Sequence, residues 1–341
     1  MRRTVPVDDY LSGLALELAR RERANVPLET LYFGGGTPSR LGGDGISRAI
    51  DHVKQFFELD PAAEVTVEAN PEDITAETVS AWVSAGVNRL SIGVQTFDDA
   101  VLQWMHRVHS SAESRNALEI ARQGGIENIS IDLIFALPGE VNRSWRDDLE
   151  QALSLEPQHI SLYGLTIEPK TPLARWESRG AVTASGEDSY ASEFLLAHEM
   201  AGDRGYHHYE VSNFAKPGFR SRHNSAYWTG AFYIGLGPSA HSFDGRTRSW
   251  NVPAYADWIA RLERGDSVVA DTEILDESNR ASERVYLGLR TDDGFRATEG
   301  DIQTAARWAE QGWAKIDGDV VRLTPEGWLR LDSLASGLTG F

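Results

Sequence analysis

An alternation of β-prone and amphipathic segments constrains the fold of this chain more than any other feature. Runs rich in β-branched and aromatic residues recur about every thirty residues up to Glu168, and a segment with helical apolar spacing follows most of them. The predicted strands are Thr30–Phe33, Glu64–Glu68, Arg89–Gln95, Asn128–Phe135 and His159–Thr166, and the predicted helices are Ile46–Phe57, Ala76–Ser84, Ser114–Arg122 and Trp145–Ser154. Consecutive βα units of this length predict an α/β fold with a parallel sheet, as a barrel or doubly wound.

The start of this series is unusual. The first helical segment, Tyr10–Glu22, has no strand before it, although each helix of a βα series should follow one. We therefore expect a partial barrel without its first strand. The core should span residues 1–168.

The rest of the chain does not continue this regular alternation. It contains predicted helices Asp188–Asp203 and Ala254–Glu263, a predicted strand Tyr206–Asn213, and a Gly/Pro-rich stretch up to Pro238. We expect an elaboration packed on the sheet over residues 169–275. Residues 276–341 should form a small C-terminal module. Its hairpin across Asp317–Asp319 and its final helix Pro325–Ser336 follow an order typical of a winged-helix α+β module.

Composition and charge exclude several classes of protein. The formal net charge of −18 repels nucleic acid and anionic membranes. No run approaches the roughly 18 apolar residues of a membrane helix, and no apolar signal core follows Met1-Arg2-Arg3. These features predict a cytoplasmic protein with at most peripheral membrane association. The 341 residues contain no cysteine, which excludes disulfides, thiolate metal sites and cysteine nucleophiles in this sequence.

Several polar or glycine residues follow the predicted strands, where parallel α/β folds bind ligands. Gly34–Thr37 ends one strand, Glu68 a second and Gln95 a third. The glycines alone are equally consistent with a tight turn that needs positive φ, and Glu68 alone with a solvated acid. Asp132 lies inside an apolar strand and needs a partner, for which Arg107 or a pair of ligand hydroxyls would serve.

Together these segments resemble one family. Tyr32-Phe33-Gly34-Gly35-Gly36-Thr37-Pro38-Ser39, Val67-Glu68-Ala69-Asn70-Pro71, Leu90-Ser91-Ile92-Gly93-Val94-Gln95, Ile131-Asp132-Leu133-Ile134 and Leu137-Pro138-Gly139 are similar to the successive motifs of radical S-adenosylmethionine proteins related to oxygen-independent coproporphyrinogen III oxidase. The resemblance implies a (β/α)6 TIM-like barrel. It also implies that S-adenosylmethionine contacts fall on Gly35, Gly36, Thr37, Glu68, Gln95, Arg107, Asp132 and Thr166.

The chain departs from that family at the metal cluster. The family's first strand ends in a CxxxCxxC loop whose thiolates hold a [4Fe–4S] cluster. With no cysteine, the chain as given lacks the ligands for this cluster, so we expect it to be inactive as a radical enzyme. A translation start placed too far downstream explains the missing segment more simply than evolutionary loss does.

A second signature lies at Arg222-His223-Asn224-Ser225-Ala226-Tyr227-Trp228, which resembles the HNxxYW sequence of the family's haem chaperones. Without the resemblance, this segment would be interpreted as a turn with a packed Tyr-Trp pair. The resemblance implies haem contacts at His223, Asn224, Tyr227 and Trp228, with His223 a possible iron ligand; His207, His208 and His241 compete for that role. A metal site built from these histidines is a minor hypothesis, because their spacing matches no zinc pattern.

The resemblance therefore implies a haem chaperone that uses haem and S-adenosylmethionine and delivers haem to respiratory acceptor proteins, with a cluster-dependent dimer in a full-length form. An alternative is an oxygen-independent coproporphyrinogen III oxidase of haem biosynthesis. A DNA-binding regulator is a third hypothesis, which the charge disfavours: the tail Leu323–Phe341 carries Arg330 against Glu326 and Asp332.

Overall fold

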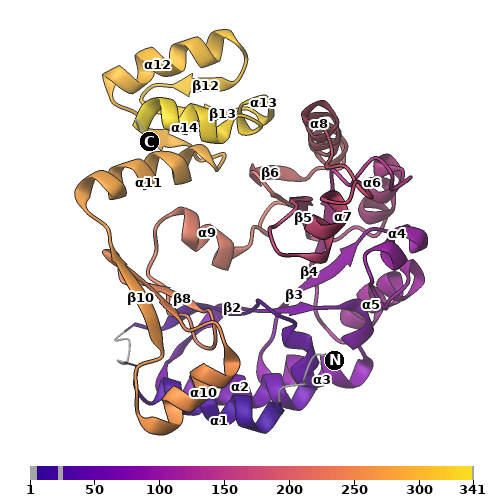
Figure 1. Cartoon of the computed structure of the whole chain (residues 1–341), viewed down its shortest axis with the longest axis vertical. Helices are drawn as coiled ribbons and strands as arrows, with labels where there is room; N and C mark the ends of the chain where they lie inside the picture. The colour runs from indigo at the N-terminus through magenta and orange to yellow at the C-terminus, as the bar shows by residue number, and fades with distance from the viewer. Residues whose placement is uncertain (1–5, 22–25, 340–341) are drawn as a thin grey trace.

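A curved seven-stranded sheet forms the centre of the molecule in the computed structural model, which describes residues 6–21 and 26–339 (Figure 1). The strand order is β1-β2-β3-β4-β5-β7-β6. Strands β1 to β5 pair in parallel, while β7 pairs antiparallel with both β5 and β6. The bounds are β1 Leu28–Phe33, β2 Leu59–Ala69, β3 Arg89–Gln95, β4 Asn128–Phe135, β5 His159–Gly164, β6 His207–Glu210 and β7 Asn213–Ala215. The sheet curls into a half-barrel, so the predicted fold class is confirmed.

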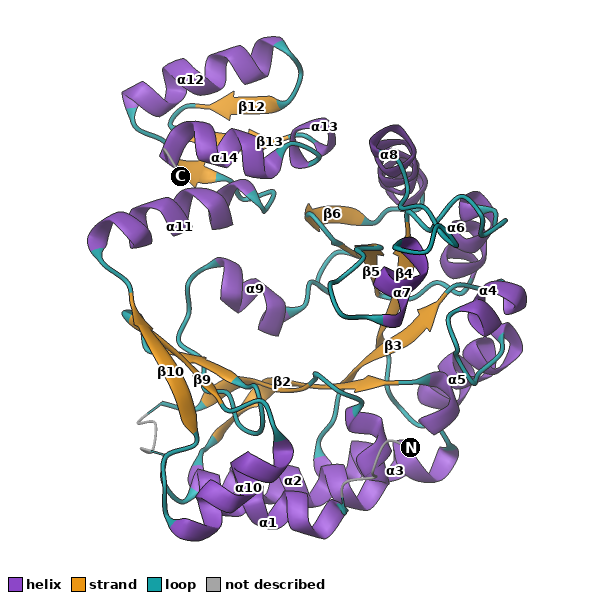
Figure 2. Ribbon diagram, viewed as in Figure 1, coloured by secondary structure: helices purple, strands orange, loops and turns teal. Residues whose placement is uncertain are grey.

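Helices cover the convex face of this sheet (Figure 2). They are α1 Val7–Leu18, α2 Gly42–Phe56, α3 Ala76–Ala85, α5 Ser111–Gln123, α6 Trp145–Ser154 and α8 Glu187–Asp203, with the shorter α4 Asp99–Trp104. The short helix α7 Pro172–Glu177 follows β5, and 3-10 turns lie at Pro38–Leu41 and Pro71–Asp73. Capping boxes start α3 at Thr75 and α5 at Ser110. In the part of the chain described here, no helix combines the length and apolar character that a bilayer span requires.

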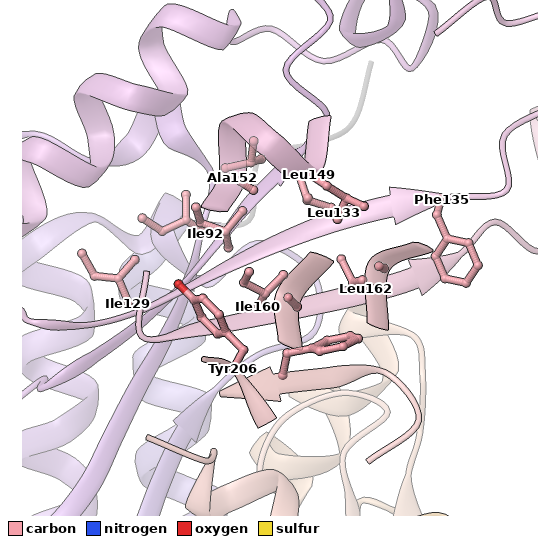
Figure 3. Close-up of a cluster of buried hydrophobic side chains, with 14 of the residues drawn as sticks. Ile92, Ile129, Leu133, Phe135, Leu149, Ala152, Ile160, Leu162 and Tyr206 are labelled. Atoms are coloured by element: carbon pink, nitrogen blue, oxygen red, sulfur yellow. The ribbon is translucent and has the colours of Figure 1, made fainter. Parts of the chain in front are cut away.

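The main core lies between the sheet and these helices (Figure 3). On β4, the alternate residues Ile129, Ile131 and Leu133 are fully buried on the helix side. Because side chains alternate across a strand, Ser130 and Asp132 point to the opposite, concave side. The buried apolar set therefore leaves a polar row on the inner face of the half-barrel.

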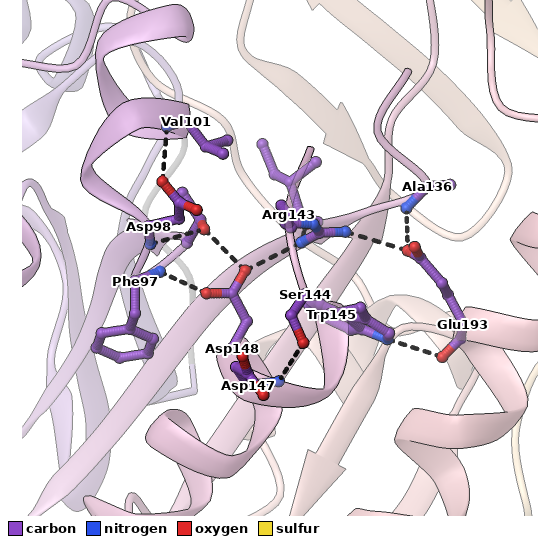
Figure 4. Close-up of polar contacts among 12 residues, drawn as sticks. Phe97, Asp98, Val101, Ala136, Arg143, Ser144, Trp145, Asp147, Asp148 and Glu193 are labelled. Carbon is purple, nitrogen blue, oxygen red and sulfur yellow. Dashed lines mark hydrogen bonds and ion pairs between the residues drawn. The ribbon is translucent and has the colours of Figure 1, made fainter. Parts of the chain in front are cut away.

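A buried ion-pair network joins β4, α6 and α8 (Figure 4). The Arg143 side chain, 2% exposed, contacts Asp148 and Glu193 at 3.1 Å each and donates to the Ile134 carbonyl. Asp148 also accepts hydrogen bonds from Thr96 Oγ1 and the Phe97 amide, both at 2.7 Å. The network ties the end of β3 to the helix that covers β4.

Residues after Ala215 add two smaller sheets. Strands β8 His241–Phe243, β9 Thr247–Asn251 and β10 Val269–Ile274 form an antiparallel sheet, accompanied by α9 Arg222–Trp228 and α10 Tyr255–Arg264. The C-terminal module contains α11 Glu277–Leu289, β11 Phe295–Arg296, α12 Glu299–Glu310, β12 Ala314–Asp317, β13 Val320–Leu323, α13 Pro325–Trp328 and α14 Leu331–Thr339. Its sheet has the order β11-β13-β12.

Two local predictions were wrong. The predicted strand Tyr206–Asn213 is a tight hairpin, because Glu210 accepts hydrogen bonds from the Ser212 amide and the Asn213 side chain and turns the chain back. The predicted helix Pro325–Ser336 is broken between α13 and α14. Helix α9 lies in the Gly/Pro-rich stretch, for which no helix or strand was predicted. The predicted helix end at Glu22, and Met1–Arg3, lie outside the described residues.

Candidate functional site

The loop that follows β1 offers open backbone to a ligand. Gly35 has φ +100°, and neither Gly35 nor Gly36 has a neighbour within 4 Å of where a Cβ would stand. Gly34 is different, since a Cβ there would lie 2.5 Å from the Tyr32 ring and 2.9 Å from a Glu68 oxygen. The Thr37 hydroxyl donates to the Gly36 carbonyl at 2.6 Å. Packing therefore requires glycine at Gly34, and the backbone conformation favours glycine at Gly35. Neither constraint applies to Gly36.

Glu68 ends β2 and faces this loop. It accepts hydrogen bonds from the Tyr32 hydroxyl at 2.7 Å and from the Gly35 amide at 3.1 Å. Burial raises the pKa of Glu68 against the opposing effect of these two donors. A carboxylate in such a position favours a cationic group that would compensate its charge.

Asp132 lies on the same inner face of the sheet. Its carboxylate accepts from Ser91 Oγ at 2.9 and 3.0 Å and from Ser130 Oγ at 3.2 Å. Burial, with a further contribution from the charge of Glu68, raises the pKa of Asp132 to about 6. Among the described residues, neither Asp132 nor Glu68 has an ion-pair partner, so this face carries two acids without a paired cation.

The other predicted S-adenosylmethionine contacts lie around the carboxyl ends of the strands. Gln95 ends β3 with φ +69°, a conformation rare for a non-glycine residue. Thr166 is exposed two residues after β5. Arg107 follows α4, where burial lowers its pKa and the charge of Glu72 opposes that effect. Within the described residues no hydrogen bond or ion pair joins Arg107 to Asp132; the serines are the partners of this acid.

Helix α9 carries the HNxxYW sequence and lies within the concave side of the half-barrel (Figure 1). Ser221 caps its first turn through the Asn224 amide. The buried Glu64 on β2 accepts from the amides of Arg222 and His223 at 3.1 and 3.0 Å. A carboxylate at a helix N-terminus is favourable, because the free amides and the helix dipole both attract it. The sheet thus fixes where the helix begins.

His223 connects this helix to β1. Its Nδ1 is 2.8 Å from Thr30 Oγ1, its Nε2 is 3.0 Å from the Tyr227 hydroxyl, and its ring stacks on Tyr32. Burial, followed by the positive charge of Arg89, lowers the pKa of His223 to about 4. The imidazole is therefore neutral at pH 7, with both nitrogens engaged.

The far end of α9 borders an aromatic cleft of about 700 Å³. Tyr227 and Trp228 line it from α9, with further aromatic rings from Tyr233, Phe243 and Tyr286. The Tyr227 and Tyr233 rings meet edge to face at 4.8 Å. Asn224 is half-buried on the same helix and does not line this cleft. The helix thus separates the acidic inner face from an aromatic space.

Comparison with known proteins assigns the family. Residues 7–152 match the model of the radical SAM superfamily. The chain is 34% identical over 316 residues to the heme chaperone HemW of Bacillus subtilis, covering 92% of this chain and 81% of that protein. It is 34% identical over 341 residues to the heme chaperone HemW of Mycobacterium tuberculosis, with 98% and 87% covered. This chain belongs to the HemW family.

The fold of this HemW-family chain is also similar to a solved structure. Coproporphyrinogen III oxidase (HemN) from Escherichia coli matches with a TM-score of 0.82 and 21% identity, over 98% of this chain and 83% of that one. At this identity the likeness establishes the fold alone.

The competing histidines of the HemW-family chain lie elsewhere. His208 stacks on Phe214 at 3.8 Å within the core, where burial lowers its pKa to about 3. His207 and His241 are exposed, and His241 stacks on Trp250. In the described ranges, no group of three or more His, Asp or Glu side chains is arranged to hold a metal ion.

Sequence reasoning missed several polar residues of the inner face. Strand pairing aligns Glu68 with Ser91, Ser91 with Ser130, and Ser130 with His159 across four strands. Arg89 is 1% exposed and its Nε has no hydrogen-bond partner. A count of every second residue back from Asp132 would have found Ser130. The sequence alone does not give the strand register that places Ser130 beside Ser91.

Proposed function

We propose that this protein is a haem chaperone, which binds haem beside α9 and S-adenosylmethionine at the glycine loop and passes haem to respiratory acceptor proteins. The names of its relatives support haem as the ligand. We further propose that it acts in the cytoplasm with at most peripheral membrane contact, and that any form of the protein that carries a cluster dimerises in dependence on it. Fractionation of cells that produce the protein tests its location.

One observation carries the haem proposal, namely the placement of Tyr227 and Trp228. The cleft they line is about 700 Å³, within the usual size of a cofactor site. Flat aromatic side chains suit the faces of a planar macrocycle. His223 does not line this cleft, but its neutral imidazole, the form that binds iron, lies 3.0 Å from the Tyr227 hydroxyl, and iron ligation would require it to release Tyr227 or Thr30.

The acidic inner face supports S-adenosylmethionine, a ligand with a positively charged sulfonium and amino group. Glu68 would hold the amino group, Asp132 the ribose hydroxyls, and the open backbone at Gly35 and Gly36 the carboxylate. The two acids are partly buried and have no ion-pair partner in the described part of the chain, and burial raises the pKa of both, so a cationic ligand would offset an electrostatic cost. Gln95, Arg107 and Thr166 would surround the remaining polar atoms.

The residues of this chain do not fit an iron–sulfur cluster, because the 341 residues contain no thiolate. We propose that this chain does not cleave S-adenosylmethionine reductively. Production of 5′-deoxyadenosine by the 341-residue protein after cluster reconstitution would contradict this. A coproporphyrinogen III oxidase would need the same cluster, and the likeness to HemN concerns the fold alone. No observation therefore favours this second function.

A titration of the purified protein with ferric haem, followed by its Soret absorption, tests the proposal. We expect saturable binding, weakened about tenfold or more by Trp228→Ala, because large aromatic contacts dominate such sites. Trp176→Ala is the matched control, since Trp176 lies on α7, a short helix without buried residues. Absence of saturable haem binding to the wild-type protein would refute the chaperone proposal.

A further inference from the structure

A second cavity of about 1090 Å³ lies on the other side of Trp228, between the end of α9, the β8–β9 turn and α11. It adjoins the aromatic cleft, because the two spaces share seven lining residues: Trp228, Gly230, Phe243, Ser282, Glu283, Leu287 and Thr339. We name this second cavity the arginine groove. Helix α9 faces α11 across it, with the β8–β10 sheet alongside (Figures 1 and 2).

The charges that line the two spaces differ. The aromatic cleft contains Glu273, Glu283 and Asp332 against Arg248, which is already paired with both glutamates. The groove is lined by five arginines, at positions 220, 246, 280, 284 and 296. Carboxylates of a ligand are therefore disfavoured in the cleft and favoured in the groove.

Two of the five arginines are already neutralised. Arg220 pairs with Asp292, and Arg296 with Asp319. The side chains of Arg246, Arg280 and Arg284 have no hydrogen bond or ion pair among the described residues. Arg280 and Arg284 are four residues apart on α11 and lie on one face of it. Three exposed, unpaired cations converge here in a chain of net charge −18.

The acids of the groove are engaged elsewhere. Asp244 accepts from the amides of Arg246 and Thr247, and Asp301 from the amide and hydroxyl of Thr298. Glu283 pairs with Arg248, and Asp293 lies 3.9 Å from Arg220. Asp244 and Asp301 keep their negative charge, because their donors are neutral, but the acids of the groove have partners other than the guanidinium groups of Arg246, Arg280 and Arg284, which stay unpaired within the described residues.

Apolar surface accompanies these cations. Phe232 is 75% exposed at the groove, and the buried indole nitrogen of Trp228 has no hydrogen-bond partner. An exposed aromatic ring beside unpaired arginines suits a ligand with a flat apolar body and acidic groups at one edge.

We propose that the arginine groove binds the two propionate carboxylates of haem, with Arg246, Arg280 and Arg284 as their partners, while the macrocycle lies in the aromatic cleft. This inference rests on the proposed haem binding and adds the residues that set ligand orientation and select a porphyrin dicarboxylate over its neutral analogues. Guanidinium groups recognise carboxylates through paired, charge-assisted hydrogen bonds.

The test compares haem with haem dimethyl ester, which has the same macrocycle without acidic groups. The wild-type protein should bind haem about tenfold or more tightly than the ester. The combined variant Arg246→Gln, Arg280→Gln and Arg284→Gln should lose that preference by binding haem about tenfold more weakly and the ester unchanged. Arg307→Gln, an exposed arginine on α12 outside the groove, should leave both affinities within about twofold.

The proposal that the groove binds propionates would be wrong if the wild-type protein bound both ligands equally well, or if the combined variant kept its haem affinity. Haem binding itself would still stand. If the wild-type protein binds neither ligand, the proposed function fails together with the groove. The three side chains are exposed, so we expect the variants to fold, as circular dichroism would verify. The single variants Arg280→Gln and Arg284→Gln, each with a smaller loss, provide the same test independently.

Discussion

The ring of Tyr32 stacks on the imidazole of His223, with centroids 4.7 Å apart and planes inclined by 16°. Its hydroxyl donates to Glu68, which also accepts from the Gly35 amide. A continuous series of contacts therefore runs from the glycine loop to the HNxxYW helix. A ligand group that binds Glu68 competes with Tyr32 for the same carboxylate.

Replacing Tyr32 with phenylalanine isolates the hydroxyl contribution. Tyr32→Phe keeps the ring stack but removes the hydrogen bond to Glu68, so we expect the free energy of unfolding to fall by about 1 kcal/mol. Urea unfolding measures this. Tyr190→Phe is the control, because the Tyr190 hydroxyl makes no hydrogen bond to any residue that the structure describes; equal losses in the two variants would contradict the assignment.

Asp132 should make stability depend on pH. Its folded-state pKa of about 6 lies above the unfolded value near 3.9, so its contribution is fully present below about pH 4 and is lost as the pH rises through 6. Asp132→Asn cannot ionise. The unfolding free energy of the wild type relative to this variant should decrease by roughly 2 kcal/mol between pH 4 and pH 7. Parallel pH profiles of the two proteins would show that Asp132 is not responsible.

The glycine loop offers a matched pair of substitutions. Gly35→Ala forces a Cβ into φ +100° and should cost about 1–2 kcal/mol of unfolding free energy. Gly36→Ala meets neither positive φ nor a neighbour and should change stability by less than about 0.5 kcal/mol. Thermal or urea unfolding of both variants measures the difference, and a larger loss for Gly36→Ala would reverse the interpretation.

The buried network at Arg143 should be important for stability. Arg143→Gln leaves Asp148 buried without its cation, and we expect a loss of about 3–5 kcal/mol. Arg146→Gln, at an exposed position on α6, the helix that carries Asp148, should stay within about 0.5 kcal/mol. Chemical unfolding followed by circular dichroism compares the two, and similar small losses would show that the network is solvated in solution.

Much of the half-barrel was predictable from local pattern. The bounds of β4 and α6 match their predictions, because an apolar run and an amphipathic helix of that length have few alternatives. The hairpin at Glu210 was not predictable, since its turn is stabilised by a buried acidic side chain rather than by glycine or proline. The pattern of a strand in a sequence gives only its apolar periodicity and does not reveal a side-chain hydrogen bond of this kind.

The same limit applies to the candidate site. Glu68 and Asp132 stand out as acids at the end of and within apolar strands, whereas Ser91 and Ser130 resemble ordinary strand residues until strand pairing aligns them. Arg89 begins a strand, where an arginine is usually exposed, yet it is buried on the inner face. Its burial depends on the strands that surround it in the curved sheet, and no local sequence pattern indicates that arrangement.

The way α9 is attached has a consequence for its dynamics. Its hydrogen bonds to the sheet come from Arg222 and His223 in the first turn, whereas its last turn meets the cleft and groove through aromatic contacts. Amide protection should therefore decline along the helix toward Trp228, because the last turn opens without breaking those anchors. Entry of a large flat ligand would then cost only the free energy of a local opening, and the sheet would keep its native pairing throughout.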